Sequence, residues 1–488
     1  MLLTAMSSGV PAAHAQEPAA RVKWEPYAIE VAQGQRVEAE LGRIRVPENR
    51  KKPDDRSIDL AFVRLKSTSA NPGPPLVFLE GGPGGSGINA ARSPALSIFQ
   101  ALREIGDVIL LDQRGTGITG PALTCGGAWN FPLDQPEGSP EQKRIATGKI
   151  RACAEQFRSK GIDISAYNPQ ESADDVDALR RALGVEKINL WGISYGTHLG
   201  LAVIRRHGDH VHRAVLTGVN GPNEEYMVLP SAVEAQISKV AALIRANAAM
   251  SQIVPDFPGT LRSLLAKLSA GPVVVELEDP QTKSPVRVTI GKGDLEFYTS
   301  SSITFTWGIM NLASLYGPLS KGDWTPLARR ALDRRRDQIP SLMGAVTACS
   351  SGTSKQRRRQ IERDSKTTQL GDAINSLLPE ICAGLGNPDL GDGFRRPIRS
   401  NVPVLLVSGT ADGRTPVSNA EAVLKGFPNG VHVIVEGASH GYDLFYFTPQ
   451  VREAMLAFLK RQPVTTTRVK LDSFPFILPR PPGQGPPR

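Results

Sequence analysis

The chain has 488 residues, of which 40% are hydrophobic and 22% are charged. This composition excludes a disordered protein, and the length suffices for a large core and exceeds one minimal domain. The formal net charge is +9, but the basic residues are scattered and no recognition motif accompanies their densest cluster, at 357–359, so we expect no nucleic-acid partner.

The first fifteen residues, MLLTAMSSGVPAAHA, combine a short apolar stretch with Ala13-His14-Ala15. That tripeptide resembles the A-x-A signal at which leader sequences are cleaved. The pattern predicts a signal peptide over residues 1–15 and a secreted or periplasmic protein, although basic residues are absent after Met1. The alternative is an unstructured N-terminus. No later segment holds about 18 consecutive apolar residues, so we expect no integral membrane segment.

Apolar and polar residues alternate at 37–41 and 58–63, which predicts half-exposed antiparallel strands. Three continuous apolar runs follow, at 75–79, 108–111 and 188–191, and each leads into glycine-rich chain. Continuous apolar runs are typical of strands buried on both faces, as in a parallel sheet. Helical patterns lie between and after these runs, and the alternation of strands and helices predicts an α/β fold.

One of these helices is predicted to start at a capping box, because Ser172-Ala173-Asp174-Asp175 precedes apolar residues at helical spacing. After a strand at 215–217, the long segment 223–399 has a mainly helical pattern, and we interpret it as an inserted cap or lid. Strand patterns resume at 404–407 and 431–435.

The predicted organisation is one α/β core in two parts, residues 24–222 and 400–462, separated by the cap. A closing helix is expected around 454–459, and a proline-rich extended tail follows at 463–488.

The chain has four cysteines, none with the C-x-x-C spacing of metal sites. Pairing neighbours along the sequence gives Cys125 with Cys153 and Cys349 with Cys382. An even number of cysteines fits disulfides in an oxidising compartment, in agreement with the predicted signal peptide. The alternative is four buried thiols.

The strongest local signal is Gly192-Ile193-Ser194-Tyr195-Gly196, which matches G-x-S-x-G directly after a predicted buried strand. In this motif the serine occupies a strained turn from strand to helix, and the small residues two before and two after let the chain segments pass closely. The motif therefore predicts Ser194 as a nucleophile. A plain glycine-rich turn is the alternative, since G-x-S-x-G also occurs by chance.

A nucleophilic serine needs a base and an acid that orients the base, and in this fold the order is Ser, acid, His. Of the seven histidines, His440 is distinguished because it lies in a loop just past the last predicted strand. Asp412 lies in the same way after the preceding strand. We therefore predict Asp412 and His440 as the partners of Ser194. Asp443 is an alternative acid, and a turn-forming role is the alternative for Asp412.

A glycine-rich segment, Glu80 to Gly87, follows the first buried run. A phosphate loop is excluded because no Gly-Lys-Ser/Thr follows. We interpret the segment as part of an oxyanion hole, in which a backbone N–H joins that of Tyr195 to hold the negative charge of an acyl-transfer intermediate.

The motifs that carry a family resemblance are EGGPGGSG at 80–87, DQRGTG at 112–117, WGISYG at 191–196, GTAD at 409–412 and GASHG at 437–441. In order and spacing they resemble the proline iminopeptidase and tripeptidyl aminopeptidase group of α/β-hydrolases, over residues 36–222 and 400–462. The pair of GGPGG and DQRG is far more specific than G-x-S-x-G. Cysteines near the positions of Cys125 and Cys153 are familiar in secreted members of the tripeptidyl type.

The resemblance implies a mostly parallel eight-stranded sheet, a largely helical cap inserted late in the chain, and release of residues from peptide N-termini. It also implies the triad Ser194, Asp412 and His440. Gly82 and Tyr195 would supply the oxyanion donors.

The chain departs from proline iminopeptidases at Glu80, where those proteins usually have histidine. They also hold the substrate's α-amino group with cap carboxylates, for which no motif is recognisable here. Glu224 and Glu225 are the candidates, with solvated loop carboxylates as the alternative.

The predicted chemistry is acyl transfer by an exported serine hydrolase, with no metal or cofactor and a peptide or small ester as substrate. The first alternative to an aminopeptidase is a carboxylesterase, because both share the acyl step. The second is a non-catalytic binding protein on a hydrolase scaffold. The sequence does not predict the oligomeric state.

Overall fold

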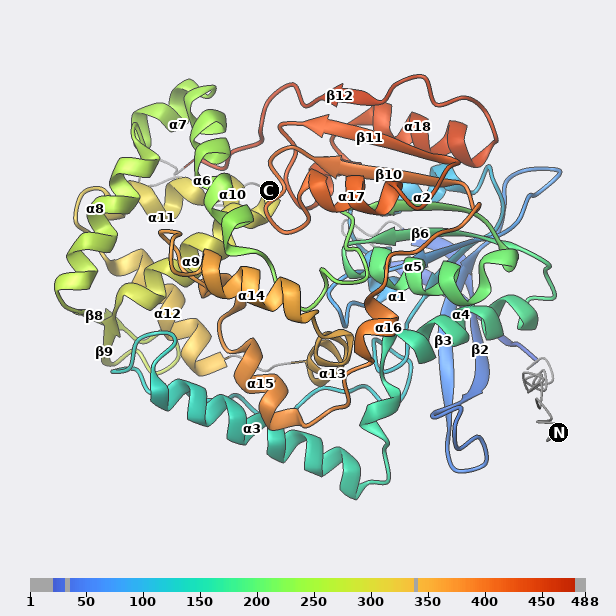
Figure 1. Cartoon of the computed structure of the whole chain (residues 1–488), viewed down its shortest axis with the longest axis horizontal. Coiled ribbons are helices and arrows are strands. Elements are labelled where there is room, and N and C mark those ends of the chain that lie inside the picture. The colour runs from blue at the N-terminus through green and yellow to red at the C-terminus, as the bar shows by residue number, and fades with distance from the viewer. Residues whose placement is uncertain (1–20, 31–35, 338–340, 479–488) are drawn as a thin grey trace, which may run out of the picture.

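The structure is a computed structural model that describes residues 21–30, 36–337 and 341–478, so the predicted signal peptide lies outside the described residues. In this part of the chain the central feature is a ten-stranded sheet in the order β1-β2-β3-β5-β4-β6-β7-β10-β11-β12 (Figure 1). Its strands are β1 (Lys23–Glu30), β2 (Arg36–Pro47), β3 (Ser57–Leu65), β4 (Leu76–Leu79), β5 (Val108–Leu111), β6 (Ile188–Ile193), β7 (Val211–Thr217), β10 (Val404–Gly409), β11 (Gly430–Glu436) and β12 (Arg468–Lys470).

The sheet is antiparallel from β1 to β5 and parallel from β5 to β12. This confirms the mostly parallel α/β architecture, but the expected count of eight strands is wrong by two. The additional strands lie at the two edges, where β1 pairs with β2 and β12 pairs with β11. Most side chains of β1 are exposed, and β12 buries only Val469. Neither segment therefore carries the apolar pattern from which strands are predicted.

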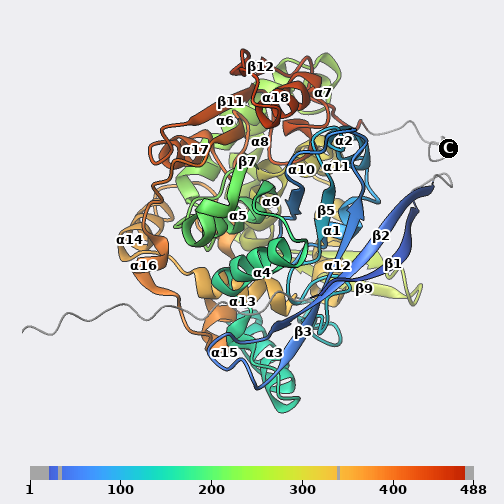
Figure 2. The same ribbon diagram turned by 90° about the vertical axis from the view of Figure 1, so that its right-hand side faces the viewer.

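Helices cover both faces of the sheet (Figure 2). Alternate strand residues belong to two separate hydrophobic clusters, as the two-residue period of a strand requires. Helices α4, α5 and α17 pack into one cluster, and α2 and α18 pack into the other. The helices of the core are α1 (Gly87–Ala90), α2 (Leu96–Leu102), α4 (Pro169–Ala182), α5 (Tyr195–His207), α17 (Val417–Leu424) and α18 (Pro449–Leu459).

The helix α4 starts earlier than its predicted capping box. The side chain of Asn168 accepts hydrogen bonds from the backbone N–H groups of Gln170 and Glu171, so Asn168 is the N-cap and Pro169 the first helical residue. Ser172 lies inside the first turn and is buried.

The segment between β7 and β10 lies beside the sheet (Figure 1) and builds a hydrophobic cluster of its own. It contains the hairpin of β8 (Val273–Glu278) and β9 (Pro285–Ile290), so it is largely but not wholly helical. Its helices are α6 (Pro230–Arg245), α7 (Ala248–Ile253), α8 (Phe257–Ala270), α9 (Lys292–Thr304), α10 (Thr306–Met310), α11 (Leu312–Leu319), α12 (Thr325–Asp337), α13 (Leu342–Ser351), α14 (Lys355–Asp364), α15 (Leu378–Leu385) and α16 (Gly391–Arg395).

Two segments outside 223–399 pack against this region. The helix α3 (Pro140–Ser159) runs along α15 (Figure 1), and Thr147 of α3 donates a hydrogen bond to the carbonyl oxygen of Glu380. Within the described part of the predicted proline-rich tail, residues 468–470 form β12, and Phe474 packs into the cluster of the inserted segment.

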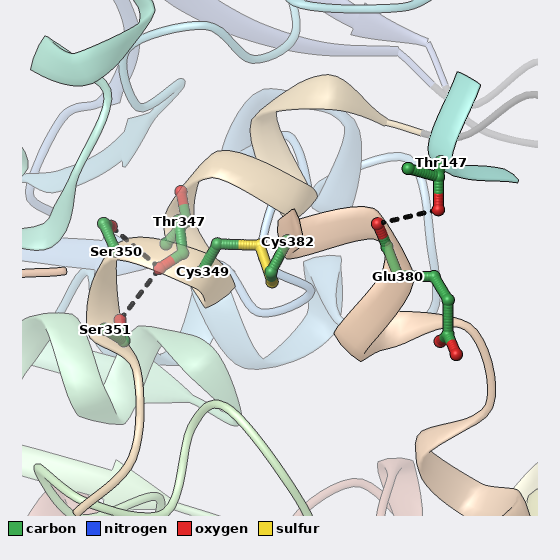
Figure 3. The surroundings of a disulfide bond; sticks show 7 residues. All are labelled: Thr147, Thr347, Cys349, Ser350, Ser351, Glu380 and Cys382. Carbon is green, nitrogen blue, oxygen red and sulfur yellow. Dashed lines mark hydrogen bonds between the residues drawn. A yellow bond between two sulfur atoms is a disulfide. The ribbon is translucent and has the colours of Figure 1, made fainter. Parts of the chain in front are cut away.

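Two disulfides join the elements of this region. The pairs are Cys125 with Cys153 and Cys349 with Cys382, which confirms the pairing of sequence neighbours. The first ties α3 to the loop that follows the DQRG motif, and the second ties α13 to α15 (Figure 3). The first bridge therefore holds α3, and the second holds α15, to the rest of the molecule.

Candidate active site

Ser194 lies between β6 and α5 with φ of 52° and ψ of −122°, a conformation that non-glycine residues rarely adopt. The turn is possible because its neighbours lack side chains. A β-carbon at Gly196 would overlap the carbonyl oxygen of Leu79, and one at Gly192 would overlap that of Gly196. Trp191, fully buried against Phe78, anchors the strand that leads into the turn.

The predicted partners of Ser194 meet it at the carboxyl ends of the parallel strands, as expected for loops at that edge of the sheet. His440 follows β11, and its Nε2 lies 3.0 Å from the Ser194 hydroxyl oxygen. Asp412 follows β10, and its Oδ2 lies 2.8 Å from His440 Nδ1. The structure thus brings all three predicted residues into one hydrogen-bonded series.

Asp412 is fully buried and is held by its own loop. Its Oδ1 accepts the backbone N–H groups of Arg414 and Thr415 at 2.8 and 2.6 Å. Its Oδ2 accepts the Thr415 hydroxyl at 2.6 Å, and the same hydroxyl oxygen lies 2.9 Å from His440 Nδ1. These contacts fix the carboxylate and the imidazole in one orientation. Thr415 has no distinguishing signal in the sequence, because a threonine three residues after an aspartate is an ordinary turn pattern.

The alternative acid has other partners. Asp443 accepts the Thr306 hydroxyl at 2.6 Å and the backbone N–H of Ser439 at 2.5 Å. These bonds join the His440 loop to α10. The carboxylate of Asp443 therefore supports the loop, and the carboxylate that accepts a hydrogen bond from the imidazole is that of Asp412.

The glycine-rich segment reaches the same site. Neither the backbone N–H of Gly82 nor that of Tyr195 donates a hydrogen bond within the described residues. Tyr195 is the first residue of α5, whose N-terminal N–H groups have no partner within the helix. Two free donors of this kind beside a serine hydroxyl match the arrangement that holds an oxyanion.

The DQRG motif has a role that the sequence did not reveal, which is to brace this segment. Asp112 accepts the hydroxyl of Ser86 at 2.6 Å and the backbone N–H of Ile88 at 3.1 Å. The Gln113 amide donates to the carbonyl oxygen of Glu80 at 3.0 Å. The glycine loop is thus fixed at both ends.

The arginine of the same motif is buried away from the serine. Arg114 forms two hydrogen bonds of 2.7 Å to the carboxylate of Asp175 in α4. A paired, buried guanidinium of this kind joins β5 to α4 and leaves no charge for a substrate.

A cavity of about 220 Å³ opens beside Ser194. Its lining residues are Glu80, Gly81, Gly82, Ile193, Ser194, Thr217, His440, Gly441, Leu444 and Phe445. Phe305, from the junction of α9 and α10, stacks its ring edge-to-face with His440 at 5.3 Å between centroids. The inserted segment therefore contacts the imidazole directly.

The candidate amine-binding carboxylates do not line this cavity. Glu225 is 1% exposed, accepts the Asn220 amide at 2.7 Å, and has its pKa raised by burial to about 7. Glu224 lines a different cavity of about 190 Å³ between α5 and α17, and burial raises its pKa as well. The solvated-loop alternative is therefore wrong for Glu225, whereas the side chain of Glu224 stays 20% exposed. Neither residue lines the cavity beside Ser194.

His198 is a histidine that was not predicted to be catalytic. It is buried in α5, where its Nδ1 lies 3.0 Å from the carbonyl oxygen of Gly221, and burial lowers its pKa to about 4.

Within the described residues, no three His, Cys, Asp or Glu side chains are grouped so that they would hold a metal ion. None of the described helices combines the length and apolarity of a membrane span.

The family model of the alpha/beta hydrolase fold matches residues 74–444, and this chain belongs to that family. It is similar to serine protease Hip1 of Mycobacterium tuberculosis, with 31% identity over 190 residues that cover 38% of this chain and 36% of that protein. Tripeptidyl aminopeptidase of Streptomyces coelicolor is 30% identical over 227 residues, which cover 44% and 41% of the two chains.

A probable proline iminopeptidase of Streptomyces coelicolor is 32% identical over 167 residues, or 33% of this chain and 38% of that protein. The matches thus span less than half the length of these relatives. Among solved structures, proline iminopeptidase of Mycobacterium smegmatis aligns with 86% of this chain and 98% of its own, at 17% identity and a TM-score of 0.36. The resemblance predicted from the motifs is confirmed.

Proposed function

We propose that this chain is an exported serine hydrolase that releases residues from the N-termini of peptides through an acyl-enzyme. One observation carries the proposal: Asp412, His440 and Ser194 form a continuous hydrogen-bonded series at the edge of a cavity. Such a series is the arrangement that activates a serine hydroxyl.

Each step follows from the contacts. When the Ser194 oxygen attacks a carbonyl carbon, its proton passes to Nε2 of His440, 3.0 Å away. This requires the tautomer with a proton on Nδ1, which the carboxylate of Asp412 favours from 2.8 Å and which it stabilises once the ring is cationic. The imidazolium then protonates the leaving amine, and water hydrolyses the acyl-enzyme by the same route.

The negative charge of the tetrahedral intermediate falls on the former carbonyl oxygen. The N–H groups of Gly82 and Tyr195 are its proposed donors, and the N-terminus of α5 adds the favourable end of the helix dipole. One donor of this kind contributes about 3 kcal/mol to the stabilisation of a transition state.

The names of the relatives support a peptide substrate, since they include a tripeptidyl aminopeptidase and a probable proline iminopeptidase. A carboxylesterase is the second candidate, because the apolar side chains of Ile193, Leu444 and Phe445 in the cavity suit a small ester. Rates on aminoacyl arylamides, N-acetylated arylamides and simple aryl esters separate the two. Preference for the ester with no arylamide cleavage would favour the esterase.

The disulfides support export to an oxidising compartment. All four cysteines are paired in disulfides, and such bonds persist outside the cytoplasm but are rare inside it. Fractionation of cells that produce the full chain tests this part of the proposal, and recovery in the cytoplasm with four free thiols would contradict it.

The catalytic assignment is tested by Ser194→Ala, which removes the nucleophile. We expect the variant to fold normally and to lose turnover almost completely, together with labelling by a fluorophosphonate. Ser97→Ala is the matched control, because Ser97 is exposed on α2 and does not line the cavity beside Ser194. Turnover by Ser194→Ala equal to that of the control would refute the assignment.

A further inference from the structure

One acidic residue lines the cavity beside the candidate nucleophile. Glu80 and His440 are the titratable side chains among its lining residues, and the remainder of the lining consists of glycines, apolar side chains and two hydroxyls. No lysine or arginine is part of that lining. The cavity therefore presents a single acidic group to whatever occupies it.

The carboxyl of Glu80 has little compensation from the protein. Its Oε1 accepts the backbone N–H of Gly81 at 2.8 Å, and within the described residues no charged side chain pairs with it. Burial raises its pKa to about 7. Ionising a carboxyl group in such surroundings costs free energy unless a cation lies beside it.

Glu80 is also close to the reacting atoms. A β-carbon on the neighbouring Gly81 would lie 3.6 Å from the Ser194 hydroxyl oxygen. Together with the 2.8 Å bond from Gly81 N–H to Glu80, this places the carboxyl within about 9 Å of that oxygen. A group attached to the acyl part of a bound substrate spans such a distance.

We infer that Glu80 is a specificity-determining residue that binds a positively charged group of the substrate, an ammonium or a guanidinium. The inference rests on the proposed function, since it concerns the substrate that Ser194 attacks. The cation would replace the compensation that the protein does not provide, so substrates that carry one are favoured over neutral isosteres. Its source is either the α-amino group or a basic side chain.

The test is Glu80→Gln. Glutamine has nearly the same size and keeps a carbonyl oxygen for the Gly81 N–H, but it has no charge. Two matched pairs of p-nitrophenyl esters separate the sources of the cation. The leucine ester against the N-acetyl-leucine ester tests the α-amino group, and the N-acetyl-lysine ester against the N-acetyl-norleucine ester tests the side chain.

We expect kcat/KM of Glu80→Gln to fall by about 10- to 100-fold on the cationic member of one pair, the range for a hydrogen bond to a charged group. The rate on its neutral partner should stay within about twofold. The pair that responds identifies the source of the cation. Glu30→Gln, on the exposed end of β1, is the control for loss of one negative charge.

Two results would overturn the inference: an equal loss on charged and neutral esters, as expected if Glu80 only braces the glycine loop, or no loss on either. Fluorophosphonate labelling of Ser194 is measured in parallel. A wild-type protein that is not labelled refutes the proposed function itself. A labelled protein without the selective loss refutes only the role of Glu80.

Discussion

Glu225 allows a quantitative test of the burial that the structure assigns to it. The side chain is 1% exposed, its Oε2 accepts the Asn220 amide, and its Oε1 has no partner within the described residues. Burial raises its pKa from the ordinary 4.5 to about 7. The substitution Glu225→Gln keeps the shape and the amide contact and removes the ionisation.

The folded and the unfolded protein differ in the pH at which Glu225 loses its proton. Between pH 4.5 and 7 the folded protein retains the proton of Glu225, whereas the unfolded chain has released it. The contribution of Glu225 to the free energy of unfolding is therefore largest below pH 4.5, falls as the pH rises through this window, and levels off above pH 7. A shift of this size corresponds to about 3 kcal/mol of unfolding free energy. Glutamine does not titrate, so the variant lacks this loss.

The measurement is equilibrium unfolding in urea at pH 4.5 and pH 8, with the disulfides intact. We expect Glu225→Gln to gain about 3 kcal/mol relative to the wild type between the two pH values. The other carboxyl groups cancel in this difference, and Glu30→Gln serves as an exposed control. If the stabilities of wild type and Glu225→Gln change in parallel with pH, Glu225 is not buried as a neutral acid and the reasoning fails.

Two further predictions concern the site and the framework. Thr415→Val removes the hydroxyl that contacts both Asp412 and His440, so kcat should fall about tenfold with little change in KM. Thr415→Ser should restore kcat. An unaltered kcat in the valine variant would contradict this positioning role. Replacing Cys349 and Cys382 by alanine opens a bridge across a sequence separation of 33 residues, so the unfolding free energy in urea should fall by about 4 kcal/mol. A loss below about 1 kcal/mol would show that the bridge does not restrict the unfolded chain.

The central strands were predictable because burial on both faces leaves a continuous apolar run. The run at 108–111 matches β5 residue for residue, and the run at 404–407 lies within β10; both strands are fully buried. The run at 431–435 lies within β11, where only Val433 and Val435 are buried. Edge strands have no such signature, since one side of each meets solvent and pairing alone defines them. This is why β1 and β12 were not predicted.

Local polar contacts were harder to predict than strands. Ser172 matched a capping pattern, but Asn168 caps α4, because its side chain reaches two free N–H groups and Pro169 suits the first helical position. Both residues are good caps by composition. The choice between them depends on where the preceding chain enters the helix, which is set by the surrounding packing.

The sequence by itself determined the fold class and the three residues of the candidate triad, because each follows a buried strand and parallel strands bring their carboxyl ends to one edge. Only the tertiary structure decided what surrounds them. Thr415 joins Asp412 to His440, and Glu80 faces the cavity while Glu225 does not. These facts depend on burial and on contacts between segments far apart in the chain, which a linear pattern does not encode.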